Sequence, residues 1–354
     1  MFLPVTYHFI TPKQTIMAAF NILAIDGGGI RGIVPLAILQ KIEEISGKKV
    51  HEMFDMMAGT STGGLIVSCL TLKEHPDSTE PKYNLEDLAK IYTTDGGTIF
   101  PIRTGIGKII RSALTLFEPE FSPAGLDKVL SEYVQGQRIK DAYRPLLVST
   151  YDLHSNMPVF FKSSEASMDE TANALIHDVC RATSAAPTYF PAYSFQHKGQ
   201  ELTGIDGGVY VNNPTMAAIA EIRRYGNAGY YKTKDGGPVN MKDISVLSLG
   251  TGSYTGEITQ KEAVSWGQLE WIQHITDIMM KGVSQTTDYE AREIMFKVDE
   301  DRPYLRLTIN IQDEQYSDMA DARPQTLQYL EDEVKKQITE NPTVISQITN
   351  FLSR

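Results

Sequence analysis

Asn-Ile-Leu-Ala-Ile-Asp-Gly-Gly-Gly-Ile-Arg-Gly, residues 21–32, sets the architecture of this chain. An apolar run with the length of a buried strand ends in three glycines, and Pro35 then opens a segment with apolar residues at helical spacing. A second strand, expected over 53–58, precedes a serine turn and an apolar helix over 62–72. This alternation predicts an α/β fold, a three-layer α/β/α sandwich around a central, mostly parallel sheet.

The rest of the chain shows no repeat, low-complexity tract or domain linker. We expect residues 1–16 to form a flexible N-terminal extension and residues 17–354 to form a single domain. The remaining elements are read from apolar patterning: strands are expected over 145–150, 158–162 and 244–249, a helix over 215–225 and a terminal helical region over 314–339.

Composition excludes several classes of protein. The net charge of −11 disfavours nucleic acid as a partner, because phosphate binding needs a basic surface. Cys69 and Cys180 lie in apolar surroundings and are expected to be buried thiols, and no Cys/His spacing indicates a metal site or a cofactor. The first 20 residues lack the features of a signal peptide, and no apolar run approaches the roughly 18 residues of a membrane span. These features predict a cytoplasmic protein.

The string Gly59-Thr60-Ser61-Thr62-Gly63 is the first candidate for catalysis. A Gly-x-Ser-x-Gly string between an apolar strand and an apolar helix can hold a serine on a sharp turn, with its hydroxyl exposed as a nucleophile. A plain Gly/Ser-rich turn is the alternative. The position between strand and helix favours the nucleophile.

The glycine-rich string supplies the next group. Gly27, Gly28 and Gly29 can bring backbone N–H groups close to a ligand at the start of a helix, where an oxyanion is stabilised. Arg31 is a further candidate, either adding charge or orienting the loop. A dinucleotide-binding turn and a purely structural turn are the rivals, but a dinucleotide fold expects an acidic residue after the second strand. That strand ends instead at Ser61.

A serine nucleophile needs a base. None of the seven histidines lies in a suitable late loop, and His154 and His197 are only surface-loop candidates. Asp206 ends an apolar segment and is followed by Gly207 and Gly208, so it is the preferred base. Partial burial is expected to raise its pKa into a useful range.

The chain resembles the patatin-like phospholipases, including the tuber storage patatins. The resemblance rests on the strings at 26–32, 59–64, 181–191, 206–208 and 247–252, in family order between about residues 20 and 335. It implies a lipid acyl hydrolase acting on phospholipids or related acyl lipids. In that family pattern Ser61 and Asp206 form the catalytic dyad, Gly27 to Gly29 line the oxyanion hole, and Gly59, Gly63, Gly207 and Gly208 support the turns.

Two alternatives to a plain lipid hydrolase stay open. Compact bacterial members of the family include antiphage effectors that degrade the cell's own membrane when activated by a cyclic nucleotide. The other alternative is a non-catalytic storage or binding protein that keeps the fold.

Two apolar stretches concern partners. Residues 96–117 contain Arg103, Lys108 and Arg111 and no acid, which suits transient contact with a lipid surface or a helix packed over the active site. A second stripe at helical spacing, over 271–279 and led by Trp271, predicts core packing or a homodimer contact more than a membrane anchor.

Overall fold

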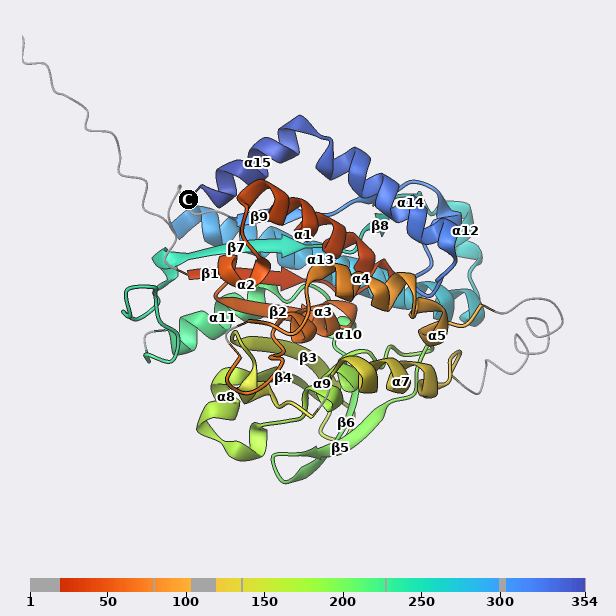
Figure 1. Cartoon of the computed structure of the whole chain (residues 1–354). Helices are drawn as coiled ribbons and strands as arrows, with labels where there is room; N and C mark the ends of the chain where they lie inside the picture. Colours follow the sequence, from red (N-terminus) through yellow and green to blue (C-terminus); the bar gives the residue numbers. More distant parts are fainter. Residues whose placement is uncertain are drawn as a thin grey trace, which may run out of the picture.

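The computed structural model describes residues 20–78, 80–102, 119–134, 136–226, 228–298 and 304–353. Within this part of the chain a mixed sheet runs through the centre, with helices on both sides (Figure 1). The strands follow the order β5-β6-β3-β2-β1-β7-β9, and β4 pairs with β3. This is the predicted α/β arrangement.

The strands of the sheet are short and mostly buried: β1 Phe20–Ile25, β2 Met56–Thr60, β3 Leu146–Asp152, β4 Met157–Lys162, β5 Tyr193–His197, β6 Gln200–Asp206, β7 Ile244–Leu249 and β9 Tyr304–Leu307. The strands β1, β2, β3, β7 and β9 run parallel, whereas β4, β5 and β6 form antiparallel pairs. A separate parallel pair joins β8, Ser253–Tyr254, to β10, Asn310–Ile311.

The α-helices connect and cover these strands: α1 Ile33–Ser46, α2 Val50–Met53, α3 Thr62–Leu70, α4 Leu85–Thr93, α5 Gly96–Ile99, α7 Pro123–Tyr133, α8 Ser163–Met168, α9 Ile176–Thr183, α10 Gly208–Val211, α11 Thr215–Tyr225, α12 Gln260–Ser265, α13 Gln268–Val298, α14 Pro324–Val334 and α15 Pro342–Leu352. Short helical turns are η1 Gly29–Gly32, η2 Ile139–Asp141, η3 Glu170–Ala172, η4 Met241–Asp243, η5 Glu314–Tyr316 and η6 Lys335–Thr339.

Both faces of the central strands are buried, which gives three layers. On β1, Leu23 and Ile25 belong to a core that includes α1, α3, α4, α9 and α14. Phe20 and Ile22 alternate to the other face, where they meet residues of α11 and α13. A parallel strand with both faces covered reads as a continuous apolar run, which is why this segment could be recognised from the sequence.

Several predicted boundaries are corrected. Met53 ends the short helix α2 instead of opening β2, and Glu52 stabilises the start of this helix by accepting from the backbone N–H of Lys49 at 2.6 Å. The terminal helical region predicted over 314–339 is helical in three pieces, because it is interrupted after Tyr316, and α14 begins at Pro324, which occupies its first turn. His197 is a buried residue of β5, not a surface-loop residue.

Other expectations meet the structure as follows. Cys69 and Cys180 are buried free thiols, as predicted. The N-terminal extension 1–16 lies outside the described residues, as do Arg103, Lys108 and Arg111 with most of the predicted basic stretch. No helix in the described ranges combines the length and the apolar character needed to cross a membrane.

Candidate active site

Ser61 lies between β2 and α3 on a strained turn. Its backbone has φ 53° and ψ −125°, a conformation that a non-glycine residue adopts only when the surrounding structure imposes it. The Ser61 N–H donates to Oγ1 of Thr183 at 2.8 Å, and that hydroxyl donates in turn to the carbonyl of Ser149 at 2.6 Å. The turn is therefore held from α9 and β3, and it presents the Ser61 side chain at the N-terminus of α3.

The register of the sheet brings Asp206 to the same level. Thr60 pairs with Ser149 between β2 and β3, and Thr150 pairs with Asp206 between β3 and β6. Ser61, which follows Thr60, therefore lies level with Thr150 of β3. Asp206 pairs with Thr150 from the other side of β3, so it lies at the same level as Ser61. The two residues are 145 positions apart in sequence (206 minus 61) and line one pocket.

Asp206 is buried, with 2% of its surface exposed. Burial raises its pKa to about 6, although the Ser61 hydroxyl and the Gly208 N–H, which donates to Oδ1 at 2.7 Å, each lower it. The other oxygen, Oδ2, is buried without a hydrogen-bond partner among the described residues. A carboxylate with one fixed and one unpaired oxygen is suited to accept a proton.

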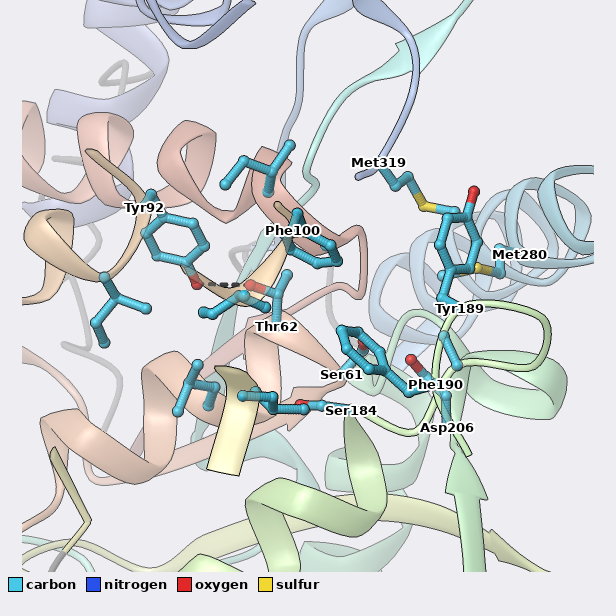
Figure 2. Close-up of a pocket in the computed structure, with 17 residues that line it drawn as sticks. Ser61, Thr62, Tyr92, Phe100, Ser184, Tyr189, Phe190, Asp206, Met280 and Met319 are labelled. Atoms are coloured by element: carbon cyan, nitrogen blue, oxygen red, sulfur yellow. Dashed lines mark hydrogen bonds between the residues drawn. The ribbon is translucent and has the colours of Figure 1, made fainter. Parts of the chain in front are cut away.

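The pocket beside these two residues is a mostly apolar cavity of about 60 Å³. Figure 2 shows Ser61 and Asp206 between two sets of side chains, with Thr62 and Tyr92 on one side and Tyr189, Met280 and Met319 on the other. The Thr62 and Tyr92 hydroxyls share a hydrogen bond of 2.5 Å. No histidine is among the described residues that line the cavity. The lining suits an acyl chain better than a polar substrate.

The three glycines of the predicted oxyanion hole differ in their hydrogen bonds. The Gly27 N–H donates to the carbonyl of Asn212 at 3.1 Å, whereas the N–H groups of Gly28 and Gly29 have no acceptor among the described residues. A Cβ at Gly28 would lie 2.1 Å from Thr251 Oγ1, so the loop packs closely there. Gly29 has φ 58°, which favours glycine. The unpaired donors are therefore those of Gly28 and Gly29.

Arg31 does not reach the Ser61 pocket. It lines an adjacent open groove, where its Nη1 donates to the carbonyl of Ser317 at 3.1 Å.

The glycines that flank the two catalytic candidates have no room for a side chain. A Cβ would lie 2.3 Å from the Gly63 carbonyl at Gly59, 2.2 Å from the Ile25 carbonyl at Gly63, and 2.2 Å from Ser149 Oγ at Gly207.

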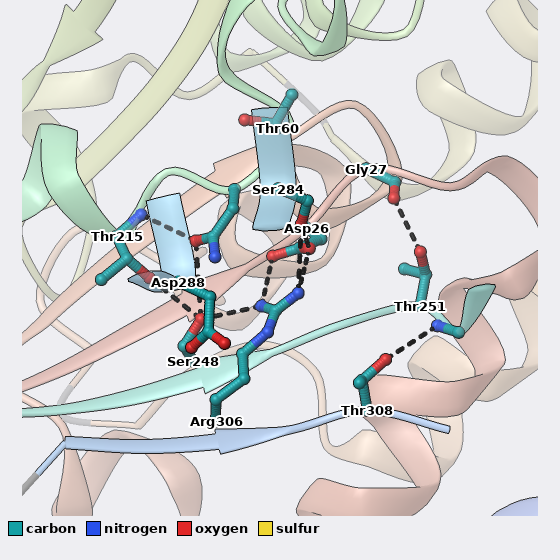
Figure 3. A network of polar contacts seen from close by, with 12 residues as sticks. Asp26, Gly27, Thr60, Thr215, Ser248, Thr251, Ser284, Asp288, Arg306 and Thr308 are labelled. Atoms are coloured by element: carbon teal, nitrogen blue, oxygen red, sulfur yellow. Dashed lines mark hydrogen bonds and ion pairs between the residues drawn. The ribbon is translucent and has the colours of Figure 1, made fainter. Parts of the chain in front are cut away.

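A buried polar network supports the glycine loop from behind (Figure 3). Asp26, the residue before the three glycines, accepts from Arg306 Nη1 at 2.7 Å and Nη2 at 2.5 Å, and from Ser284 Oγ at 2.5 Å. Burial lowers the pKa of Arg306, but the neighbouring Asp26 carboxylate raises it by more, so the net change is a rise. Thr251 Oγ1 adds a hydrogen bond to the Gly27 carbonyl at 2.7 Å. The loop is thus fixed from β9, α13 and the segment after β7.

Sequence reasoning missed two supporting residues. Arg306 lies in β9, 280 positions from Asp26, and no local pattern connects them. Thr183 lies inside the 181–191 string. Its hydroxyl, in a segment otherwise suited to packing, was the available sign in the sequence that this residue forms a hydrogen bond at the site. The same string contributes Ser184, Tyr189 and Phe190 to the pocket.

Comparison with known proteins gives a consistent result. A family model described as patatin-like phospholipase matches residues 23–219. Patatin-like protein 1 of Oryza sativa subsp. indica is 34% identical over 82% of this chain and 74% of its own length. Patatin-like protein 3 of Arabidopsis thaliana is 30% identical over 81% of this chain and 73% of its own length. A Solanum tuberosum protein named probable inactive patatin-3-Kuras 1 is 28% identical over 82% of this chain and 78% of its length.

Proposed function

Because the chain belongs to the patatin-like phospholipase family, we propose that it cleaves lipid acyl esters with Ser61 as nucleophile and Asp206 as general base. One observation carries the proposal. The strained Ser61 turn and a buried carboxylate with an unpaired oxygen line the same apolar cavity. Strained backbone and a raised carboxylate pKa are both features that cluster at catalytic sites.

In the proposed acylation step, the ester carbonyl lies against Ser61 with its acyl chain in the apolar cavity. Ser61 Oγ attacks the carbonyl carbon, and its proton passes to the carboxylate of Asp206. The tetrahedral intermediate then collapses: the carbon–oxygen bond to the alcohol breaks, and the departing alcohol takes the proton from Asp206. The products of this step are a free alcohol and an acyl ester on Ser61.

Deacylation repeats the same proton transfers with water. Asp206 takes a proton from a water molecule that attacks the Ser61 ester, and returns it to Ser61 Oγ as the fatty acid leaves. A carboxylate of ordinary pKa would be a weak base toward an alcohol. Since the pKa of Asp206 is about 6, its ionised form predominates near neutral pH and is more basic than an ordinary aspartate.

The negative charge that develops on the carbonyl oxygen is assigned to Gly28 and Gly29. Their N–H groups have no acceptor among the described residues, and Gly29 lines the Ser61 cavity. The N-terminus of α3 adds a favourable dipole at the same place. Loss of one such donor typically costs about 2.7–4 kcal/mol of transition-state stabilisation.

Contact with a lipid surface is assigned to α13. Trp271, Ile275, Ile278 and Met279 are 40–45% exposed, so the predicted core packing of this stripe is wrong. Ile278 lines the open groove beside the Ser61 cavity and Met280 of the same helix lines the cavity itself, so the helix that carries the stripe also reaches the substrate site. Replacing Ile275 by Glu is expected to lower hydrolysis of vesicle lipids relative to a soluble ester. An unchanged ratio together with a change from dimer to monomer indicates the predicted subunit contact instead.

The test of the activity is fatty acid release from a phospholipid extract by the wild-type chain, Ser61→Ala and Asp206→Asn. We expect release by the wild type and a loss of at least about 10³-fold in each variant. Full activity in either variant overturns the dyad, and no activity in the wild type favours the non-catalytic alternative. The cyclic-nucleotide-activated effector stays a prediction from the resemblance, tested by the same assay with and without cyclic dinucleotides.

A further inference from the structure

An open groove adjoins the Ser61 cavity on the side away from Thr62 and Tyr92. Phe100, Tyr189 and Met280 line both spaces, so a substrate held at Ser61 can extend directly into the groove. Figure 2 shows Tyr189 and Met280 together on this side of Ser61 and Asp206. The part of a lipid that leaves the acyl cavity, its head group, faces this groove.

Arg31 is a buried cation in this groove with unused hydrogen-bonding capacity. Its side chain is 9% exposed, and Nη1 donates to the Ser317 carbonyl. Nε is buried and has no partner among the described residues. Burial lowers the pKa of Arg31, while Asp277, Tyr189 and Asp318 raise it in part. A guanidinium with free donors is suited to a phosphate or carboxylate oxygen.

Asp318 is held beside Arg31 by its neighbours in sequence. The carbonyl before it, of Ser317, accepts from Arg31, and the carbonyl after it, of Met319, accepts from the Ile30 N–H at 2.8 Å. The Asp318 side chain is exposed, with Oδ1 accepting from the Ala320 N–H at 2.9 Å. The Asp318 carboxylate therefore lies at the solvent-exposed edge of the groove, whereas the Arg31 side chain is buried at its base.

Asp277 faces the same groove from α13. It lies three residues before Met280 and seven before Ser284, so the three share one helix face. Ser284 bonds to Asp26 and Met280 lines the Ser61 cavity, which directs this face toward the site. Asp277 is exposed, and the structure gives its carboxylate no hydrogen bond or ion pair to a described residue. Desolvation and Asp318 raise its pKa, whereas Arg31, His274 and Lys281 lower it in part, and the net change is a rise.

We propose that this groove binds the head group of a zwitterionic phospholipid, with the phosphate on Arg31 and the ammonium between Asp277 and Asp318 beside Tyr189. The inference rests on the proposed lipid hydrolysis and specifies its substrate class. One guanidinium compensates one phosphate. The two carboxylates repel each other and any further negative charge, whereas an ammonium is attracted by both and by the face of an aromatic ring. An anionic head group lacks this compensation.

The test uses lipids that stay monomeric, so that the repulsion between an acidic protein and an anionic membrane does not enter. We compare kcat/KM for dihexanoylphosphatidylcholine and dihexanoylphosphatidylglycerol below their micelle concentrations. The wild type is expected to prefer phosphatidylcholine about tenfold, as two partly exposed charge contacts allow. In Asp277→Asn/Asp318→Asn the ratio is expected to approach one, mainly through KM. Asparagine keeps both shapes and the acceptor for the Ala320 N–H.

Glu86→Gln is the matched control, because Glu86 is an exposed acid of α4 that lines neither the groove nor the Ser61 cavity, so the ratio is expected to stay unchanged. A wild-type ratio near one, or an unaltered ratio in the double variant, overturns the head-group assignment. Ser61-dependent hydrolysis of p-nitrophenyl butyrate, which has no head group, separately tests the proposed function. Calorimetric titration of Ser61→Ala with both lipids asks the head-group question without hydrolysis, and equal affinities there also overturn it.

Discussion

Asp206→Asn is expected to make the protein more stable while it removes the base. The pKa of Asp206 rises from 3.8 to about 6 on folding because the carboxyl is buried. Since one unit corresponds to about 1.4 kcal/mol, holding the ionised carboxylate in the folded chain costs about 3 kcal/mol. Below about pH 4 the carboxyl is protonated and the folded chain does not bear this cost, so it is at its most stable. That stability is lost as the pH rises toward 6 and is fully absent at pH 8.

Urea unfolding of the two proteins at pH 5 and pH 8 measures this effect. The variant should exceed the wild type by about 3 kcal/mol at pH 8 and by about half as much at pH 5, where the folded carboxyl is mostly protonated. The kcat/KM of the wild type should fall on the acid side with a midpoint near pH 6, because only the ionised form accepts the Ser61 proton.

Asp152→Asn is the control of opposite sign. Burial raises the pKa of Asp152, but hydrogen bonds from Ser155, Thr203 and His154 outweigh this and hold it below its usual value. Its ionised form therefore stabilises the fold above pH 4, and the variant should be less stable than the wild type at pH 8. The reasoning about Asp206 is refuted if Asp206→Asn is no more stable than the wild type at pH 8, or if its advantage does not change with pH.

Three further predictions concern the same site. Ser61→Gly should be more stable than Ser61→Ala by about 1 kcal/mol in urea unfolding, because glycine relieves the strained turn. Gly28→Ala should lower kcat by about 100-fold or more, since the new Cβ meets Thr251 and displaces an oxyanion donor. Arg306→Met should destabilise the chain by about 3–5 kcal/mol in the same unfolding assay, because Asp26 is left buried without its partner, and Asp26→Asn/Arg306→Met should recover part of that loss.

The central part of the fold was predictable because its signals are local. The apolar run of β1, the glycines after it and the Ser61 string each carry their own pattern, and parallel strands place their carboxyl ends at one edge. Ser61 and Asp206 were both expected to be functional, and the register of β2, β3 and β6 places them at one pocket.

What could not be predicted depends on long-range contacts or on weak turn signals. The β5–β6 hairpin turns at Lys198 and Gly199, which both have positive φ, and Lys-Gly is a less frequent turn sequence than Asn-Gly. The Gly27 N–H was expected to face the oxyanion, but the approach of Asn212 gives it an acceptor. Arg306 reaches Asp26 because the folded sheet places β9 next to β7 and β7 next to β1, so that the guanidinium extends past Ser248 of β7.

Labelling with a fluorophosphonate, followed by peptide mapping, tests most directly whether Ser61 is the covalent nucleophile. The wild-type chain should gain one adduct on Ser61. Ser61→Ala should gain none, and Asp206→Asn should react far more slowly because the serine then lacks its base. A wild-type chain that stays unlabelled, or an adduct on another residue that persists in Ser61→Ala, contradicts the assignment of Ser61 as the nucleophile.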